Sequence, residues 1–178
     1  RYIFHLRPEA KFHHGRRVTA QDIVFSLERA ADPATGSRTT ATYLGDIVGM
    51  KEKLAGKAQR ISGLRAIDDA TVEIIIDGPK AYFLAKRTYS VAFVVDRENV
   101  ASGPDWYRRP NGTGPFKVKT WEMDQHLVLE RNQDFHRGTP QVKYLVFRLL
   151  AGVPIRMYER GEIDVANVGA GPHESPEP

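Results

Sequence analysis

The stretch that decides the fold of the first part of the chain is Val18-Thr19-Ala20-Gln21-Asp22-Ile23-Val24-Phe25-Ser26-Leu27. Thr19 brings a hydroxyl and Asp22, three residues later, a carboxylate, which is the pattern of a capping box at the start of a helix. Asp32-Pro33 ends the helix, because proline cannot continue the hydrogen-bond ladder. Between these signals, apolar residues recur at helical spacing: Ile23, Val24, Leu27, Ala30 and Ala31.

Strand patterns surround this helix. Tyr2, Phe4 and Leu6 alternate with their neighbours and predict a strand over residues 2–7. Two more strands, over 61–67 and 71–77, flank the turn Asp68-Asp69-Ala70, whose short carboxylates can accept hydrogen bonds from local amides. The segment that opens the chain is therefore expected to combine a small sheet with at least one helix.

The remaining pattern continues this mixture of hairpins and helices. Helices are predicted over 43–58, 80–87 and 154–160, and strands over 91–95, 116–121, 126–131, 142–149 and 163–168. Residues 122–125 are expected to connect a hairpin. Residues 99–112 are irregular, and the change of pattern near residue 110 marks the predicted domain junction. The fold class is therefore α+β, and residues 169–178, with three prolines, are expected to form a disordered or frayed tail.

Composition excludes some classes of protein. The 178 residues hold 26 Lys and Arg against 22 Asp and Glu, and 41% are hydrophobic, which argues against a disordered chain. The basic residues cluster only in pairs such as Arg16-Arg17 and Arg108-Arg109, so they do not form the stripe that a nucleic-acid surface needs. No apolar run is long enough to span a bilayer. The absence of cysteine excludes disulfides and thiolate metal sites.

No catalytic, metal or cofactor pattern is evident. The serine elbow, the phosphate loop and the zinc-protease helix motif are absent. His5, His13 and His14 lack a third ligand at fixed spacing, so they predict no metal site. Asp68-Asp69 are interpreted as turn formers rather than as an acid–base pair. The sequence therefore predicts neither an enzyme nor a bound cofactor.

A series of motifs resembles one known family in their order and approximate spacing. They are Tyr2–Pro8, Lys11–Gly15, Val18–Leu27, Asp32–Ser37, Gly63–Asp69, Pro79–Phe83, Asn111–Phe116, Leu127–Asn132 and Gly161–Val165. The chain resembles the family 5 extracellular solute-binding proteins, which are the oligopeptide- and dipeptide-binding receptors of bacterial ABC importers. One departure is His14, which stands where the family usually has an acidic residue before the glycine.

The resemblance implies part of one lobe of a two-lobed, periplasmic-binding-protein-like fold, with mixed sheets and flanking helices. Residues 1–108 would be the accessory subdomain of the N-terminal lobe, and residues 109–168 part of the ligand-facing sheet. The chain would then be a fragment of a longer receptor. Because closure of both lobes supplies most of the contact area, we expect the fragment alone to bind ligand poorly.

The implied function is that of the extracytoplasmic substrate-binding component of a peptide ABC transporter, which captures oligopeptides and delivers them to the membrane permease. The protein would be periplasmic or at the cell surface, with or without a lipid anchor. Nickel chelates, haem, glutathione and oligosaccharides remain alternative ligands, and a peptide hydrolase or a chaperone-like interaction domain remains an alternative class. A peptide or other small solute and the permease subunits are the expected partners.

The resemblance also suggests residues that contact the ligand. Tyr43 aligns with a pocket-lining tyrosine of peptide binders, and Tyr89 falls where relatives carry a polar ring near the ligand. The turn of residues 111–114, which precedes the ligand-facing sheet, would lie near the cleft, although a purely structural role as a tight turn is the alternative. For both tyrosines, the alternative is packing in the core. The predicted ligand-binding residues are Tyr43, Tyr89, Asn111, Gly112, Thr113 and Gly114.

Overall fold

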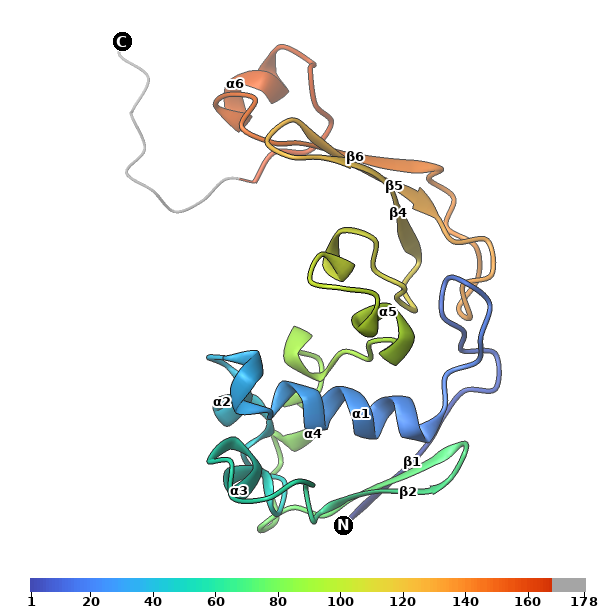
Figure 1. Ribbon diagram of the computed structural model, residues 1–178. Helices are drawn as coiled ribbons and strands as arrows, with labels where there is room; N and C mark the ends of the chain where they lie inside the picture. The colour runs from blue at the N-terminus through green and yellow to red at the C-terminus, as the bar shows by residue number, and fades with distance from the viewer. Residues whose placement is uncertain (168–178) are drawn as a thin grey trace.

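Two three-stranded antiparallel sheets lie toward opposite ends of the molecule, with most of the helices between them (Figure 1). The computed structural model describes residues 1–167. The first sheet has the order β1-β3-β2 and the second the order β4-β5-β6. Their strands are β1 (Tyr2–His5), β2 (Leu64–Asp68), β3 (Thr71–Ile74), β4 (Phe116–Glu122), β5 (His126–Arg131) and β6 (Tyr144–Arg148). This arrangement confirms the α+β fold class.

Helix α1 (Ala20–Ala30) begins and ends where the sequence predicts. The carboxylate of Asp22 accepts hydrogen bonds from the backbone amide of Thr19 at 2.8 Å and from its hydroxyl at 2.9 Å. The helix buries Val24 and Leu27 against the first sheet, where it contacts β2 and β3. The buried core of this region comprises Ala20, Val24, Leu27, Ala30, Ala31, Leu44, Ile47, Met50, Ile61, Leu64, Val72, Ile74 and Phe83.

The helix predicted over residues 43–58 is wrong as a single element. Instead, α2 (Thr40–Leu44) and α3 (Met50–Leu54) are separated by a segment that pairs with the chain beyond β3. Ile47 forms an isolated bridge with Ile76, and the amide of Val48 donates to the carbonyl of Ile75 at 3.0 Å. These long-range bonds compete with helical ones, and Gly49, with a φ of 81°, starts α3 from a left-handed conformation.

The strand predicted over residues 91–95 is also wrong. Residues Ser90–Ala92 form the short 3₁₀ helix η2, and the extended segment after it pairs with no strand. The hydroxyl of Ser26 accepts a hydrogen bond from the amide of Val95 at 2.9 Å and so replaces a strand partner. A side chain on α1 therefore holds this segment where the sequence suggested a sheet.

The other elements follow the prediction with shifted boundaries. The hairpin turn is confirmed, because Asp68 accepts from the amide of Ala70 at 2.8 Å, although β2 starts only at Leu64. No strand forms over residues 163–167, so that prediction is wrong there; residue 168 and the predicted tail, 169–178, lie outside the described residues. The remaining helices are η1 (Pro33–Thr35), α4 (Phe83–Lys86), α5 (Arg97–Ala101), η3 (Trp106–Arg108) and α6 (Pro154–Glu159).

Candidate functional site

Tyr43 and Tyr89, which the sequence suggested separately, form a stacked pair. Their ring centroids are 3.7 Å apart and the ring planes differ by 4°. Tyr43 belongs to α2 and is half-buried, whereas Tyr89 directly precedes η2 and is 40% exposed. Stacked phenol rings offer apolar area and two hydroxyl groups, a combination that suits a ligand with both apolar and polar parts.

A buried carboxylate joins the two segments that carry these tyrosines. Asp46, two residues after α2, accepts hydrogen bonds from Nζ of Lys80 at 2.6 Å and from Nζ of Lys86 at 2.8 Å. Burial alone would raise the pKa of Asp46, but the two lysines outweigh it and hold that pKa below its usual range. Because Lys86 lies three residues before Tyr89, this ion pair helps to fix the position of the tyrosine pair.

Asn111 is buried, and protein groups already bond its polar atoms. Its Nδ2 donates to a carboxylate oxygen of Asp96 at 2.5 Å, and its Oδ1 accepts from the amide of His14 at 3.1 Å. Its backbone amide donates to the side chain of Asn99 at 2.9 Å. These bonds support the structural-turn alternative for Asn111, and its contact with a ligand stays a prediction.

The next three residues of the turn lie half-buried beside the loop that holds His13. The carbonyl of Gly112 accepts from the amide of His13 at 2.8 Å, and the carbonyl of Gly114 accepts from its Nε2 at 3.1 Å. Thr113 lies between these two anchored glycines. Burial lowers the pKa of His13 and keeps its ring neutral, an effect that nearby Lys117 reinforces.

Asp96 connects three segments that are far apart in the sequence. One of its oxygens accepts from the guanidinium of Arg16 at 2.7 Å, while the other accepts from Asn111. The same Arg16 donates two hydrogen bonds of 2.9 Å to Asp22 at the start of α1. This Arg16–Asp96 network thereby ties α1 and α5 to the turn before β4. Sequence reasoning missed it, because no local pattern links residues 16, 22, 96 and 111.

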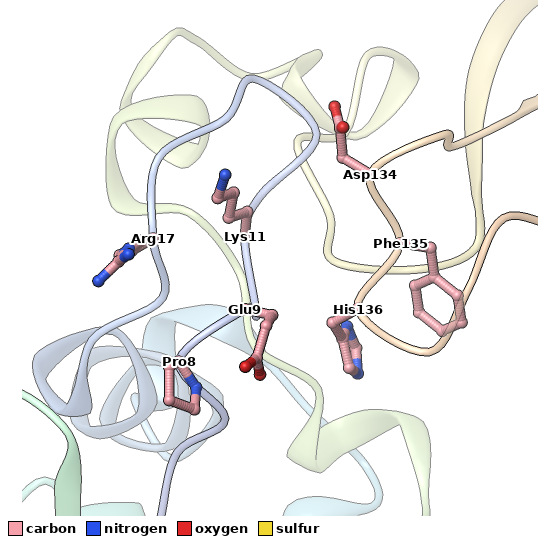
Figure 2. A pocket seen from close by; sticks show the side chains of 7 residues that line it. All are labelled: Pro8, Glu9, Lys11, Arg17, Asp134, Phe135 and His136. Atoms are coloured by element: carbon pink, nitrogen blue, oxygen red, sulfur yellow. The ribbon is translucent and has the colours of Figure 1, made fainter.

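Two cavities open at the surface of the described part of the chain. The first, of about 440 Å³, lies between the segment of residues 8–17 and the loop after β5. Figure 2 shows its lining side chains around an open gap, with Phe135 turned away from it. Among the described residues, no hydrogen bond joins side chains of its two walls. The second, of about 620 Å³, lies along β4 and is lined by His13, His14, Arg108, Arg109, Pro110 and residues 117–122.

The described residues contain no group of three or more acidic, histidine or cysteine side chains that could hold a metal ion. Instead, Nδ1 of His5 lies 3.4 Å from the hydroxyl of Thr71, while His13 bonds Gly114. Within the same part of the chain, no helix is long and apolar enough to cross a membrane. Aromatic and charged side chains gather at the tyrosine pair and along β4.

Comparison with known proteins gives the wider context. The sequence model described as bacterial extracellular solute-binding proteins, family 5 Middle, matches residues 1–177. The periplasmic oligopeptide-binding protein OppA of Escherichia coli (strain K12) is 33% identical over 176 residues, which cover 93% of this chain and 32% of that protein. The dipeptide-binding protein DppE of Bacillus subtilis (strain 168) is 27% identical, with 95% of this chain and 32% of that protein covered.

A solved structure agrees with these relatives. The Escherichia coli murein tripeptide binding protein MppA superposes with a TM-score of 0.83 at 29% identity, and the match covers 90% of this chain and 33% of that protein. The chain thus spans about a third of the length of the proteins it matches. Because the family match extends over almost the whole sequence, the chain belongs to the bacterial extracellular solute-binding proteins of family 5, a family of binding proteins and not of enzymes.

Proposed function

We propose that this chain is part of the extracytoplasmic receptor of a peptide importer, which captures oligopeptides and presents them to the membrane permease. The observation that carries the proposal is the set of relatives whose names state peptide binding and whose matches cover more than nine-tenths of this chain. In this proposal, residues 1–108 act as the accessory subdomain and residues 109–168 contribute to the ligand-facing sheet.

The tyrosine pair supports a role in ligand contact. Tyr89 keeps 40% of its surface exposed, although it stacks directly on Tyr43. The partly buried bonds of Asp46 to Lys80 and Lys86 hold the surrounding backbone, so the tyrosine pair can present a rigid surface to a ligand. A preformed surface loses little side-chain entropy when the ligand binds. The turn of residues 111–114 contributes by fixing the start of β4.

The test uses the receptor that carries residues 1–178 and measures ligand-dependent thermal stabilisation with a defined library of tripeptides and pentapeptides. A ligand at one hundred times its Kd stabilises a protein by about 2.7 kcal/mol, which such a measurement resolves. We expect Tyr43→Ala to weaken peptide binding by about tenfold and Tyr43→Phe to weaken it much less, since the stacked ring remains.

Tyr158→Ala is the matched control, because Tyr158 is an exposed tyrosine on α6. Unchanged affinity of a stably folded Tyr43→Ala variant would remove the tyrosine pair from the ligand site. A receptor that binds no peptide but is stabilised by a nickel chelate, haem, glutathione or an oligosaccharide would redirect the ligand assignment. Turnover of a bound peptide would favour a hydrolase.

One relative adds a bile acid to the ligands that the same experiment should test. The probable deoxycholate-binding periplasmic protein YgiS of Escherichia coli (strain K12) is 31% identical over 181 residues. Stacked aromatic rings also suit the flat apolar face of a bile acid. Stabilisation by deoxycholate, with none by the peptide library, would favour this ligand.

A further inference from the structure

The second cavity is a groove with excess positive charge along β4. We call it the β4 groove and define it by His13, His14, residues 108–110 and residues 117–122. Within the described part of the chain, Arg109 and Lys117 have no carboxylate within ion-pair distance. Arg108 is only loosely paired, since its Nε lies 3.8 Å from exposed Asp105. Glu130 is the cross-strand partner of Lys117 on β5, but the two side chains do not come within ion-pair distance, so the three cationic side chains leave the groove with an excess of positive charge.

The other charged residues of the groove do not cancel this excess. Glu122 is its one carboxylate and lies 3.7 Å from Nε2 of His126, outside the lining. Lys119 keeps its positive charge, and its Nζ donates a hydrogen bond to the hydroxyl of Tyr144 at 2.9 Å across the sheet. Burial lowers the pKa of His13, which disfavours a positive charge on its ring. Arg108, Arg109 and Lys117, together with Lys119 held by Tyr144, therefore give the groove its positive charge.

The shape of the groove suits a small solute rather than a single water molecule. Its volume of about 620 Å³ lies within the range typical of ligand pockets. Six consecutive residues of β4 line it, and β4 is an edge strand whose one neighbour among the described strands is β5. Trp121 supplies an aromatic wall, and Tyr107 packs edge-on against it with ring centroids 6.2 Å apart.

Two polar atoms of the lining residues are also buried without a partner. They are Nε1 of Trp121, which can only donate, and Nδ1 of His13, which accepts when its Nε2 carries the proton. Such atoms carry a desolvation cost that a nearby polar ligand can reduce after a small shift of the side chains. The indole of Trp121 therefore also offers a spectroscopic reporter inside the groove.

We propose that the β4 groove binds an oxyanion group, a carboxylate or a phosphate, of a small solute. The cationic side chains attract the group, and the ring of Trp121, which Tyr107 supports from outside the lining, packs against the carbon skeleton that bears it. The lining includes neither Tyr43 nor Tyr89, so failure of oxyanion binding in the groove and failure of peptide binding at the tyrosine pair can be distinguished. Because Arg108 and Arg109 are exposed, binding is expected to weaken as salt screens their charges.

The experiment titrates the receptor that carries residues 1–178, labelled with 5-fluorotryptophan, and follows its fluorine spectrum. Trp121→Phe assigns the resonance of Trp121, and Trp106 serves as an internal reference outside the groove. The probes are inorganic phosphate and glutarate at low ionic strength, with sodium chloride of matched ionic strength as the reference titration. We expect a saturable shift of the Trp121 resonance with phosphate, glutarate or both, and none with chloride.

Paired variants separate a defined site from general charge attraction. Arg109→Gln combined with Lys117→Gln removes two groove cations and is expected to weaken binding by at least tenfold, given about fivefold for each partly exposed charge. Arg38→Gln combined with Lys57→Gln makes the same change of net charge at exposed positions outside the groove, and should leave the affinity unchanged.

The outcomes distinguish the sources of the oxyanion. Saturation by phosphate alone assigns a phosphate-bearing solute, and saturation by glutarate alone assigns a carboxylate. A shift that grows linearly and equally with chloride overturns the proposal, as does unchanged affinity of the Arg109 and Lys117 double variant. The absence of any saturable shift in the receptor would also overturn it, because the groove would then be closed by another part of the protein.

Discussion

Arg16→Ala tests whether the Arg16–Asp96 network holds the chain together. Arg16 donates two hydrogen bonds of 2.9 Å to Asp22 and one of 2.7 Å to Asp96, and both carboxylates are at least nine-tenths buried. Truncation leaves both acids buried without their cation. Breaking a fully buried ion pair costs about 3–5 kcal/mol. The side chain of Arg16 is 40% exposed, so water can solvate the two carboxylates in part after truncation and reduce this cost.

We therefore expect Arg16→Ala to lower the free energy of unfolding by about 2–3 kcal/mol. In a folding unit of about 150–250 residues, such a loss corresponds to a decrease in Tm of about 5–10 °C. The measurement is urea unfolding followed by circular dichroism, with thermal unfolding as a second readout. Arg17→Ala is the control, because Arg17 is exposed and lies outside the network; its effect should stay within about 0.5 kcal/mol.

The pH dependence provides a sharper criterion for the same variant. Burial alone would raise the pKa of Asp22, but hydrogen bonds from Arg16 and Thr19 hold it below its usual range. A carboxyl group with a depressed folded-state pKa stabilises the fold above its unfolded pKa of about 3.9, and this stabilisation is lost as the pH falls through the folded-state pKa. The difference between wild type and variant should thus be full at pH 7 and shrink below about pH 4. A difference that is equally large at pH 2.5, or one below 0.5 kcal/mol at pH 7, would refute the reasoning.

Two further substitutions test local features. Gly49→Ala should lower the free energy of unfolding by more than about 3 kcal/mol, because the φ of Gly49 is 81° and a Cβ atom would lie 2.6 Å from the backbone nitrogen of Ser62. The control is Gly15→Ala, which has a φ of 92° but lies in open space and should cost only about 1 kcal/mol in the same unfolding assay. Equal losses in the two variants would contradict the close approach at Gly49. Arg87→Met should leave stability unchanged or raise it by about 1 kcal/mol, since all three guanidinium nitrogens of Arg87 are buried without a hydrogen-bond partner above the ring of Phe83. The control for that substitution is Arg97→Met, which removes an exposed arginine from the ring of Phe25, and a clear loss of stability in Arg87→Met alone would argue against the prediction.

Patterns of a few neighbouring residues correctly predicted the elements that are held by hydrogen bonds between those same neighbours. The capping box of Thr19 and Asp22 and the turn at Asp68 depend on residues within a few positions, so the sequence shows them directly. The break between α2 and α3 depends instead on strand-like bonds to residues 75–77, about 30 positions away. A pattern read along the chain registers the apolar spacing of Leu44, Ile47 and Met50 but not this competing partner.

The candidate site shows the same division. The resemblance to a family pointed to Tyr43 and Tyr89, but only the fold shows that the two rings stack. Asp46 falls within the helix predicted over residues 43–58, and the sequence around it gives no sign that Lys80 and Lys86 approach it. The β4 groove was likewise invisible, because Arg109 and Lys117 belong to different segments and their charges combine only when β4 packs beside the loop of His13.

The strand order β1-β3-β2 has a consequence for the sequence of folding events. β2 and β3 are joined by a short turn and can pair early, whereas Tyr2 of β1 pairs with Ile74 across about 70 residues. Closing so long a loop is entropically costly, so we expect β1 to dock late, after α1 has packed on the hairpin. Until then, one edge of β3 would have no strand partner, although all four of its residues are buried in the final structure. An unfilled edge of this kind invites pairing with another molecule, so the interval before β1 docks is when the chain is most prone to aggregate.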